Sequence, residues 1–421
     1  MNSRRKIMRH DKILKFPAGF LWGVSTSAYQ TEGGIECDWS RWEKSEKRIK
    51  KLKAENKNPD DYICGQACDS YNRVEEDINL VEQLNCQACR FTVEWARVEP
   101  ENGKISMPAI KHYQNLIKRL KNKGMEPFLT LNHYTLPVWI SGIGGWENKK
   151  TIEHYLKFAE TIIEAVGQDV KYWLTFNEPQ IQIGYGYISG QFPPNVKNLW
   201  RARKALKNLM QAHKQAYNLI HKKLGAGAQA SITHNLIYYT PYKNNFLNNL
   251  IVKLLKYICN RRIIEMAAGC QDFIGLQYYH HDRIKLKLGG RFLIADSENE
   301  NKELTDMGWE IFPQGIYYLL MELKKYGKPI FITENGIADA NDSRREKFII
   351  EHLRYIHKAM AEGADVRGYF HWSLLDNFEW AHGWGPKFGL YSVDRASFKR
   401  EPRPSAAVYA EICKNNEVKI V

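Results

Sequence analysis

Eight short apolar segments alternate with longer amphipathic segments along almost the whole chain, and this alternation constrains the fold more than any other feature. The segments of strand length are residues 20–26, 88–93, 126–132, 172–177, 228–233, 273–278, 330–333 and 366–372. The segments of helical length are residues 71–84, 108–122, 152–165, 199–224, 246–268, 314–326, 344–361 and 406–414. Regular alternation of this kind predicts a parallel sheet covered by helices. Because no Pro/Gly/Ser-rich linker interrupts the series, we expect one α/β domain, a single (β/α)8 TIM barrel.

The chain is longer than such a barrel requires. It has 421 residues, whereas the fold typically takes ~250. The excess lies in connections that follow strands, namely residues 27–68, 179–197, 280–312 and 373–404. In a barrel such connections surround the carboxyl ends of the strands, where active sites are built, so we expect long βα loops around a pocket. A doubly wound open sheet is the alternative, but Gly33-Gly34 lacks the glycine pattern of a phosphate-binding loop.

The charge of the chain does not indicate a nucleic-acid partner. The net charge is +14, but the basic residues are spread along the sequence, many of them on the helical segment 199–224. No stripe of arginines interleaved with aromatic residues is present, so we interpret the charge as surface charge and expect no nucleic acid to bind.

The N-terminal residues and the hydropathy pattern indicate a soluble protein. Residues 1–15 are basic and contain no apolar stretch of signal-peptide length, so we expect a flexible arm that precedes a domain over residues 16–421. No run approaches the ~18 apolar residues of a membrane span. We therefore expect a cytoplasmic protein with no membrane partner, and self-association into a homo-oligomer stays open.

Eight cysteines raise the question of a metal site. The spacing of Cys64, Cys68, Cys86 and Cys89 is compatible with zinc, but a full helical segment separates the two pairs. Free thiols are the better interpretation, and they are compatible with a reducing compartment. We expect no metal and no cofactor.

Two glutamates follow two of the apolar segments. Thr175-Phe-Asn-Glu-Pro179 contains Glu178, and Ile332-Thr-Glu-Asn-Gly336 contains Glu334. A barrel would bring both strand ends to one pocket mouth. A pair of carboxyl groups on either side of a sugar is what glycoside hydrolysis requires, one as an acid and one as a nucleophile or base.

Several further motifs identify a resemblance that covers nearly the whole chain. They are Phe16 to Gly33 (FPAGFLWGVSTSAYQTEG), Arg90 to Val98 (RFTVEWARV), His133, the two glutamate motifs, Trp372 to Trp380 (WSLLDNFEW) and Phe388 to Leu390 (FGL). In this order and spacing they resemble family 1 glycoside hydrolases of the β-glucosidase type.

The resemblance implies roles for individual residues. Glu178 would be the general acid and base, and Glu334 the nucleophile of a retaining mechanism, with Arg90 and Tyr279 beside it. Asn177 would donate to the 2-hydroxyl of the sugar. The sugar-binding residues that it implies are Gln30, His133, Trp372, Glu379, Trp380 and Phe388.

Two positions depart from the family pattern. Gln277 stands where the family usually has asparagine, two residues before the tyrosine, and Tyr134 stands where a tryptophan commonly follows the histidine. Both changes lie in or next to the sugar subsite, so they bear on sugar preference more than on the type of reaction.

The resemblance implies an exo-acting retaining β-glycosidase that removes terminal non-reducing β-D-glucosyl residues, with galactosyl or fucosyl as alternatives, from a small β-glycoside or oligosaccharide. A 6-phospho-β-glycosidase is one alternative, but the sequence keeps Glu379 and Trp380, and a carboxylate facing C6 would repel a phosphate. A retired catalytic scaffold that only binds or senses sugar is the other. It predicts the loss of Glu178, Glu334 or Arg90, and all three are present.

Overall fold

A computed structural model describes residues 12–289, 292–297 and 303–420. Its main sheet contains nine parallel strands in the order β6-β5-β4-β3-β2-β13-β12-β9-β7. Their bounds are β2 Leu21–Ser25, β3 Ala88–Thr92, β4 Glu126–Thr130, β5 Tyr172–Leu174, β6 Gln229–Ser231, β7 Thr233–Asn235, β9 Ile274–Gln277, β12 Ile330–Asn335 and β13 Val366–Trp372. The two ends of this order, β6 and β7, are consecutive pieces of one segment, so the sheet closes into the eight-stranded barrel that the sequence predicts.

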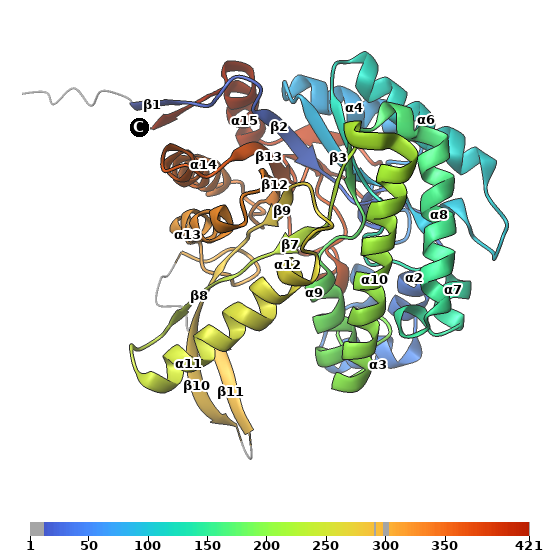
Figure 1. Cartoon of the computed structure of the whole chain (residues 1–421), viewed down its shortest axis with the longest axis horizontal. Helices are drawn as coiled ribbons and strands as arrows, with labels where there is room; N and C mark the ends of the chain where they lie inside the picture. Colours follow the sequence, from blue (N-terminus) through green and yellow to red (C-terminus); the bar gives the residue numbers. More distant parts are fainter. Residues whose placement is uncertain (1–11, 290–291, 298–302, 421) are drawn as a thin grey trace, which may run out of the picture.

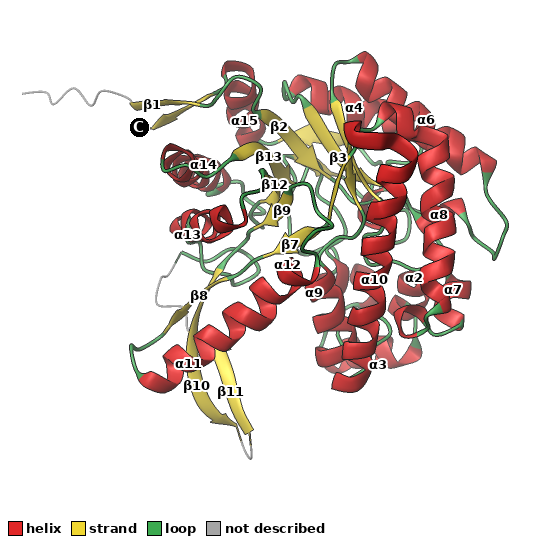
Figure 2. Cartoon of the chain, in the orientation of Figure 1, coloured by secondary structure: helices red, strands yellow, loops and turns green. Residues whose placement is uncertain are grey.

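Helices surround the strands on the outside (Figures 1 and 2). The principal helices are α4 Val74–Gln83, α6 Met107–Asn122, α8 Lys150–Val166, α10 Leu199–Leu224, α11 Phe246–Leu255, α12 Arg262–Met266, α13 Gln314–Leu323, α14 Arg345–Ala361 and α15 Pro404–Asn415. Except in α11, whose buried Val252 belongs to a separate small cluster, their buried faces pack on the outer side of the barrel in one continuous apolar core. A smaller cluster from six strand segments fills the interior, and its members are Ala88, Phe128, Leu174, Phe273, Phe331 and Phe370. The barrel is therefore packed on its inside and on its outside, as is typical of (β/α)8 barrels.

The long connections contain secondary structure of their own. Residues 27–68 form α1 Ala28–Thr31, α2 Asp38–Glu43, α3 Glu46–Ala54 and the 3₁₀ turn Pro59–Tyr62, and the loop after β4 contains α7 Val138–Gly142. After β5, the helix α9 Pro179–Ile183 continues into the π-helical turn Gly184–Ser189. The last connection contains β14 Tyr391–Val393 and β15 Arg400–Pro402. These segments build the walls above the carboxyl ends of the strands.

Residues 280–312 do not form a plain loop. They contain a hairpin of β10 His281–Gly289 and β11 Phe292–Ser297, and β10 also pairs in parallel with β8 Tyr238–Pro241. Figure 1 shows this small sheet projecting from the barrel beside α11. The alternation of apolar and amphipathic segments predicts only the eight barrel strands, and it gives residues 280–312 as a loop.

Two expectations about local structure need correction. Lys12–Lys15, expected to belong to a flexible arm over residues 1–15, form β1, which pairs antiparallel with β16 Glu417–Ile420. The rest of that expected arm, residues 1–11, lies outside the described residues. The first and the last strand of the described chain therefore lie side by side (Figure 1). The helix expected over 246–268 is divided, since a π-helical turn at Lys256–Arg261 separates α11 from α12.

Within the described ranges, no helix combines the length and the apolar character that crossing a membrane requires. All eight cysteines are free thiols. Six of them are buried, including Cys64, Cys68, Cys86 and Cys89, the four whose spacing was compatible with zinc. Over the same part of the chain, no cluster of three or more His, Cys, Asp or Glu side chains has the arrangement of a metal site.

Candidate active site

The two glutamates meet at the carboxyl ends of the barrel strands. Glu334 lies within β12, and Glu178 follows β5 and precedes α9. Their strands are far apart in the chain, and barrel closure brings both side chains to one pocket. Both carboxyl groups are buried, with 5% and 4% of the residue exposed for Glu178 and Glu334, so their protonation depends on their protein neighbours.

Glu334 lies against a cation and a hydroxyl. Arg90, in β3, is fully buried, and its Nη1 donates to Oε1 of Glu334. The Tyr279 hydroxyl donates to the other oxygen, Oε2, at 2.5 Å. Burial raises the pKa of Glu334, whereas the Arg90 guanidinium and the Tyr279 hydroxyl act in the opposite direction. Because both contacts favour the ionised form, they suit a carboxylate that attacks as a nucleophile.

Asn177 has a fixed amide orientation. Its Oδ1 accepts hydrogen bonds from Arg90 Nη2 at 2.6 Å, Thr233 Oγ1 at 2.9 Å and Gln277 Nε2 at 2.9 Å. The donating Nδ2 lies 3.0 Å from Nε2 of His133. With its oxygen saturated, the amide can offer only N–H groups, which is what a contact to a sugar hydroxyl oxygen needs. Gln277, one of the two departures from the family pattern, therefore helps to hold Asn177.

Glu178 has a different environment. The Tyr134 hydroxyl donates to its Oε2, and no basic side chain pairs with it among the described residues. Burial and the neighbouring Glu334 carboxylate raise the pKa of Glu178 to about 8, and the hydrogen bond from Tyr134 opposes that rise. The two carboxyl groups thus have environments that separate their pKa values, so that Glu178 holds the proton.

The backbone of Tyr134 and Glu178 has an unusual conformation. Tyr134 has a φ of 74° and Glu178 a φ of 42°, both in the left-handed region that side chains other than glycine rarely adopt. Trp380, which lines the same pocket, has a φ of 50°. Such conformations cost free energy and concentrate at functional sites, where the surrounding structure holds them.

A third carboxyl group, that of Glu379, lines the same pocket. Gln30, on α1, donates a hydrogen bond from its Nε2 to Oε2 of Glu379 at 3.3 Å. Ser27 donates to the Gln30 Oε1 at 2.7 Å and so fixes the orientation of that amide. Burial, together with Glu334 and Glu178, raises the pKa of Glu379 to about 8. The protonated form can both donate and accept a hydrogen bond, as recognition of a sugar hydroxyl requires.

Aromatic rings line much of the rest of the pocket. The His133 ring is nearly parallel to those of Trp380 and Trp372, with centroids 5.8 and 6.2 Å away. Burial and the nearby Arg90 hold the pKa of His133 well below its usual range, so the imidazole is neutral. Phe388 packs edge-on against Tyr279 at 6.1 Å. Flat rings beside directional polar groups are suited to the two faces of a sugar ring.

All the sequence-predicted site residues come together here. Every one of them lines a single pocket except Arg90, which lies behind Glu334. Sequence reasoning missed the residues on the outer part of this pocket, which are Tyr185, Asn235, Ile237, His280, Asp282 and Trp309. They come from the end of β7, from the π-helical turn after α9, and from residues in and around β8 and β10, none of which carries a motif that the sequence alone singles out.

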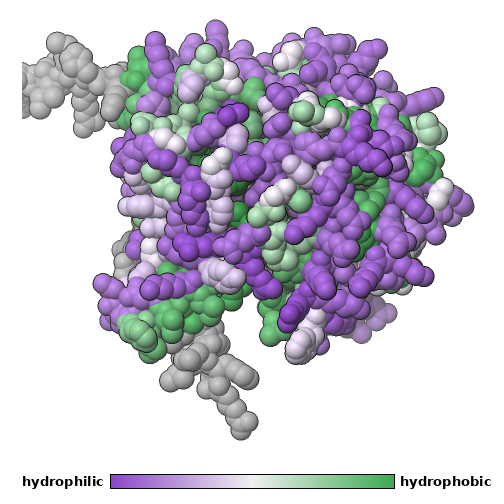
Figure 3. Space-filling view, in the orientation of Figure 1, coloured by the Kyte–Doolittle hydropathy of each residue, from purple (hydrophilic) through white to green (hydrophobic). Residues whose placement is uncertain are grey.

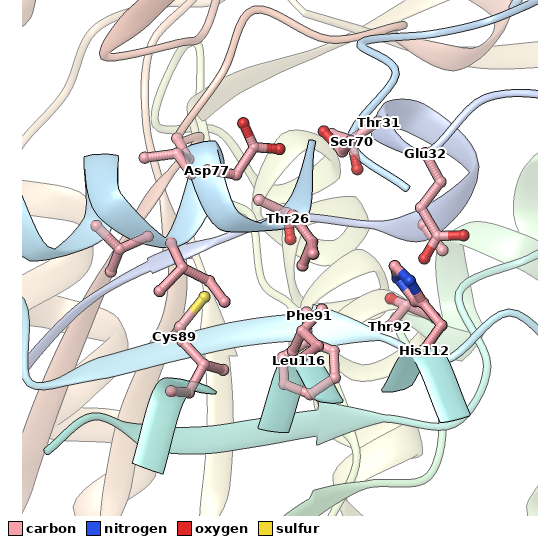
Figure 4. A pocket seen from close by; sticks show the side chains of 16 residues that line it. Thr26, Thr31, Glu32, Ser70, Asp77, Cys89, Phe91, Thr92, His112 and Leu116 are labelled. Carbon is pink, nitrogen blue, oxygen red and sulfur yellow. The ribbon is translucent and has the colours of Figure 1, made fainter. Parts of the chain in front are cut away.

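A second cavity lies between α4, α6 and the strands β2 and β3 (Figure 4). It contains the carboxylates of Glu32 and Asp77, but each of these pairs with an arginine: Glu32 with Arg97 at 2.8 Å and Asp77 with Arg400 at 2.9 Å. Such ion pairs are what buried structural carboxylates usually need. Glu178, in contrast, is left able to carry a proton.

A closed parallel barrel with a buried carboxyl pair at the carboxyl ends of its strands, one of them held beside an arginine, defines a glycoside hydrolase. The comparisons with known proteins agree. The model of glycosyl hydrolase family 1 matches residues 13–267 and 259–418. The chain belongs to this family.

Relatives that are named β-glucosidases or β-galactosidases are similar to this chain over nearly its whole length. β-Glucosidase A of Thermotoga maritima is 32% identical and covers 96% of this chain and 99% of its own. A β-galactosidase of Pyrococcus woesei is 28% identical over 96% of this chain and 98% of its own. Among solved structures, a β-glycosidase from Pyrococcus horikoshii superposes with a TM-score of 0.88 at 34% identity, covering 97% of each chain. The T. maritima β-glucosidase in complex with glucoimidazole gives 0.88 at 30% identity, covering 96% of this chain and 99% of its own.

Proposed function

We propose that the protein is a retaining exo-β-glycosidase that removes terminal β-D-glucosyl residues through a covalent glycosyl-enzyme. The observation that carries this proposal is the unequal environment of the two carboxyl groups. Glu334 is held by Arg90 and Tyr279, and Glu178 is buried without a basic partner in the described chain.

In the first step, the Glu334 carboxylate attacks the anomeric carbon while Glu178 gives its proton to the glycosidic oxygen. The bond to the leaving group breaks, the alcohol departs, and the sugar is left as an ester of Glu334. Formation of the ester removes the negative charge of Glu334, which had raised the pKa of Glu178. Glu178 is then able to accept a proton.

In the second step, Glu178 takes a proton from water as the water oxygen attacks the anomeric carbon. The ester bond breaks, Glu334 leaves as a carboxylate, and the sugar is released with its original anomeric configuration. Asn177 supports both steps, because its N–H can donate to the 2-hydroxyl while Arg90, Thr233 and Gln277 saturate its oxygen.

Two observations support an unphosphorylated sugar. Three carboxyl groups, those of Glu178, Glu334 and Glu379, face the pocket, and Arg90 is engaged by Glu334. Lys387 is not among the residues that line the pocket. A phosphate would therefore meet acidic groups, of which Glu334 is held in the ionised form, without a compensating cation from these residues. Structures of the T. maritima β-glucosidase in complex with glucoimidazole and with galacto-hydroximolactam support glucose-like and galactose-like sugars as the first candidates.

Hydrolysis of p-nitrophenyl β-glycosides of glucose, galactose, fucose and mannose tests the proposal, with NMR to record the first-formed anomer. We expect turnover of the β-glucoside, release of the β-anomer, and a covalent adduct on Glu334 with a 2-fluoro-glucoside. Release of the α-anomer would contradict the retaining mechanism. A folded protein without turnover on any sugar would instead support the retired, sugar-binding scaffold.

A further inference from the structure

One face of α11 and of the π-helical turn that follows it exposes an unusual number of large apolar side chains. Six of them, between residues 246 and 258, are 44–79% exposed. We call them the α11 apolar face, and they are Phe246, Leu247, Leu250, Leu254, Tyr257 and Ile258. Figure 3 shows apolar side chains gathered over α11 at the lower left of the molecule. A contiguous apolar surface of this kind on a folded protein usually marks an interaction site.

The helix is held with this face outward because its other side is packed. Val252 is buried in a small cluster with Tyr239 and Ile284. Asn248 is also buried, and the Asn245 side chain caps the helix by accepting from the Asn248 N–H at 2.8 Å. The segment therefore has two apolar sides: one packs in a buried cluster, and the other, the α11 apolar face, is exposed.

Basic residues predominate along this segment, and the acidic groups next to it include Glu265, which follows it, and Glu322, which pairs with Lys256 and Arg261. Residues 243–264 contain five basic and no acidic residues, namely Lys243, Lys253, Lys256, Arg261 and Arg262. Lys243 and Lys253 are exposed, whereas Lys256 and Arg261 face Glu322 at 3.7 and 4.0 Å. An apolar helical face flanked by lysines is the pattern of a helix that lies in the interface of an anionic bilayer.

The helical segment that carries the α11 apolar face also contacts the wall of the active-site pocket, through a buried residue that is not part of that face. Asn260, at the end of the same helical segment, binds the backbone of Ile237 through two hydrogen bonds of 3.3 and 2.9 Å. Ile237 lines the pocket of Glu178 and Glu334. The segment thus connects the α11 apolar face to the pocket wall.

We propose that the α11 apolar face binds the surface of an anionic phospholipid bilayer and holds the protein there as a peripheral protein. Apolar side chains would enter the acyl boundary, and the lysines would meet lipid phosphates. If two copies of the chain met through this face, the exposed Lys243 and Lys253 of one copy would approach those of the other, and the like charges would repel. The expectation of no membrane partner rests on the lack of a spanning segment, and a helix that lies on the surface of a bilayer does not need one.

Co-sedimentation with vesicles tests this proposal. The full-length protein is mixed with vesicles of phosphatidylglycerol and phosphatidylcholine, or of phosphatidylcholine alone. We expect binding to the anionic vesicles that weakens as salt rises. The double variant Leu250→Gln/Leu254→Gln should lower the partition coefficient about tenfold or more, because two apolar side chains no longer enter the lipid. The two leucines are half-exposed, so circular dichroism should show an unchanged fold.

The matched control is Ile105→Gln/Met107→Gln, which also replaces two exposed apolar side chains with glutamine, but at the start of α6. It should bind vesicles as the unmodified protein does. Absence of binding by the unmodified protein, or equal binding by the α11 variant, would overturn the proposal. A dimer seen by light scattering without lipid, and lost in the α11 variant, would also overturn it in favour of a contact between two copies.

Discussion

The Tyr134 hydroxyl donates a hydrogen bond to Oε2 of Glu178, the carboxyl group that we propose as the general acid and base. Tyr134 is itself held in place, since its carbonyl oxygen accepts from Gln182 Nε2 at 3.0 Å. The residue departs from the tryptophan common in the family, and a phenol in this place can stabilise the ionised form of Glu178 directly. This contact links one of the two departures from the family pattern to the proton-transfer step.

Tyr134→Phe should move the pH dependence of the enzyme upward. A hydrogen bond to a carboxylate stabilises its charged form and lowers its pKa, so losing the bond raises the pKa of Glu178. Glu178 has to be protonated in the first step, and the basic limb of kcat/KM should therefore shift to higher pH by about one unit. Tyr185→Phe, another tyrosine of the pocket, is the control and should leave the limb in place. A basic limb that does not move in Tyr134→Phe would exclude this effect of the hydrogen bond.

The two carboxyl groups should respond differently to azide. Glu178→Ala should lower kcat for an aryl glycoside by a factor on the order of 10²–10⁴, and azide should restore turnover with a β-glycosyl azide as product. Glu334→Ala should give an α-glycosyl azide, because azide then occupies the place of the nucleophile. The product is identified by NMR, and the opposite pair of anomers would require the two roles to be exchanged.

Arg90→Lys should affect catalysis through geometry. Lysine keeps the positive charge but cannot contact Glu334 and Asn177 at once, as the two terminal nitrogens of Arg90 do. We expect kcat/KM to fall by about a hundredfold and the pKa of the acidic limb to rise. Arg97→Lys, which changes a partly buried arginine paired with Glu32 outside the pocket, is the control. Equal losses in the two variants would point to stability and not to the site.

Glu379→Gln should make the protein more stable, and more so at higher pH. Burial and the other two glutamates raise the pKa of Glu379 to about 8 in the folded state, from 4.5 in the unfolded state. Between these values the unfolded chain releases a proton that the folded protein retains, so stability is lost as pH rises from about 5 to 8. The amide cannot ionise, and Tm should increase by roughly a few degrees at pH 8 and less at pH 5.

The thermal unfolding series should include Glu401→Gln as its control. Glu401 is an exposed carboxylate that pairs with Lys399 on the surface. Its substitution should leave the pH dependence of Tm close to that of the unmodified protein. If Glu379→Gln gave a pH-independent change in Tm, the raised pKa of Glu379 would not be the cause.

Local patterns were sufficient for much of the fold. The helix expected over 199–224 agrees with the bounds of α10, and each expected strand overlaps a barrel strand, with shifts at the ends. The spacing of apolar residues depends only on neighbours within a few positions, so one sequence carries it. The strand pair of β1 with β16 lies outside that pattern because its two strands are distant in the chain. The β10–β11 hairpin is local, but β10 also pairs with β8, about 40 residues earlier. The π-helical turn after α11 interrupts a helical pattern that the spacing of apolar residues gives as continuous.

The sequence by itself determined the order of the strands and helices, the two glutamates at strand ends, and the family whose motifs they carry. Only the tertiary structure decided what surrounds each glutamate. Arg90 meets Glu334 across 244 residues and Tyr134 meets Glu178 across 44, and these contacts exist because the barrel closes. A pKa depends on burial and on charges within a few ångströms. The chain order of two carboxyl groups therefore cannot tell which one holds the proton, whereas their neighbours in space can.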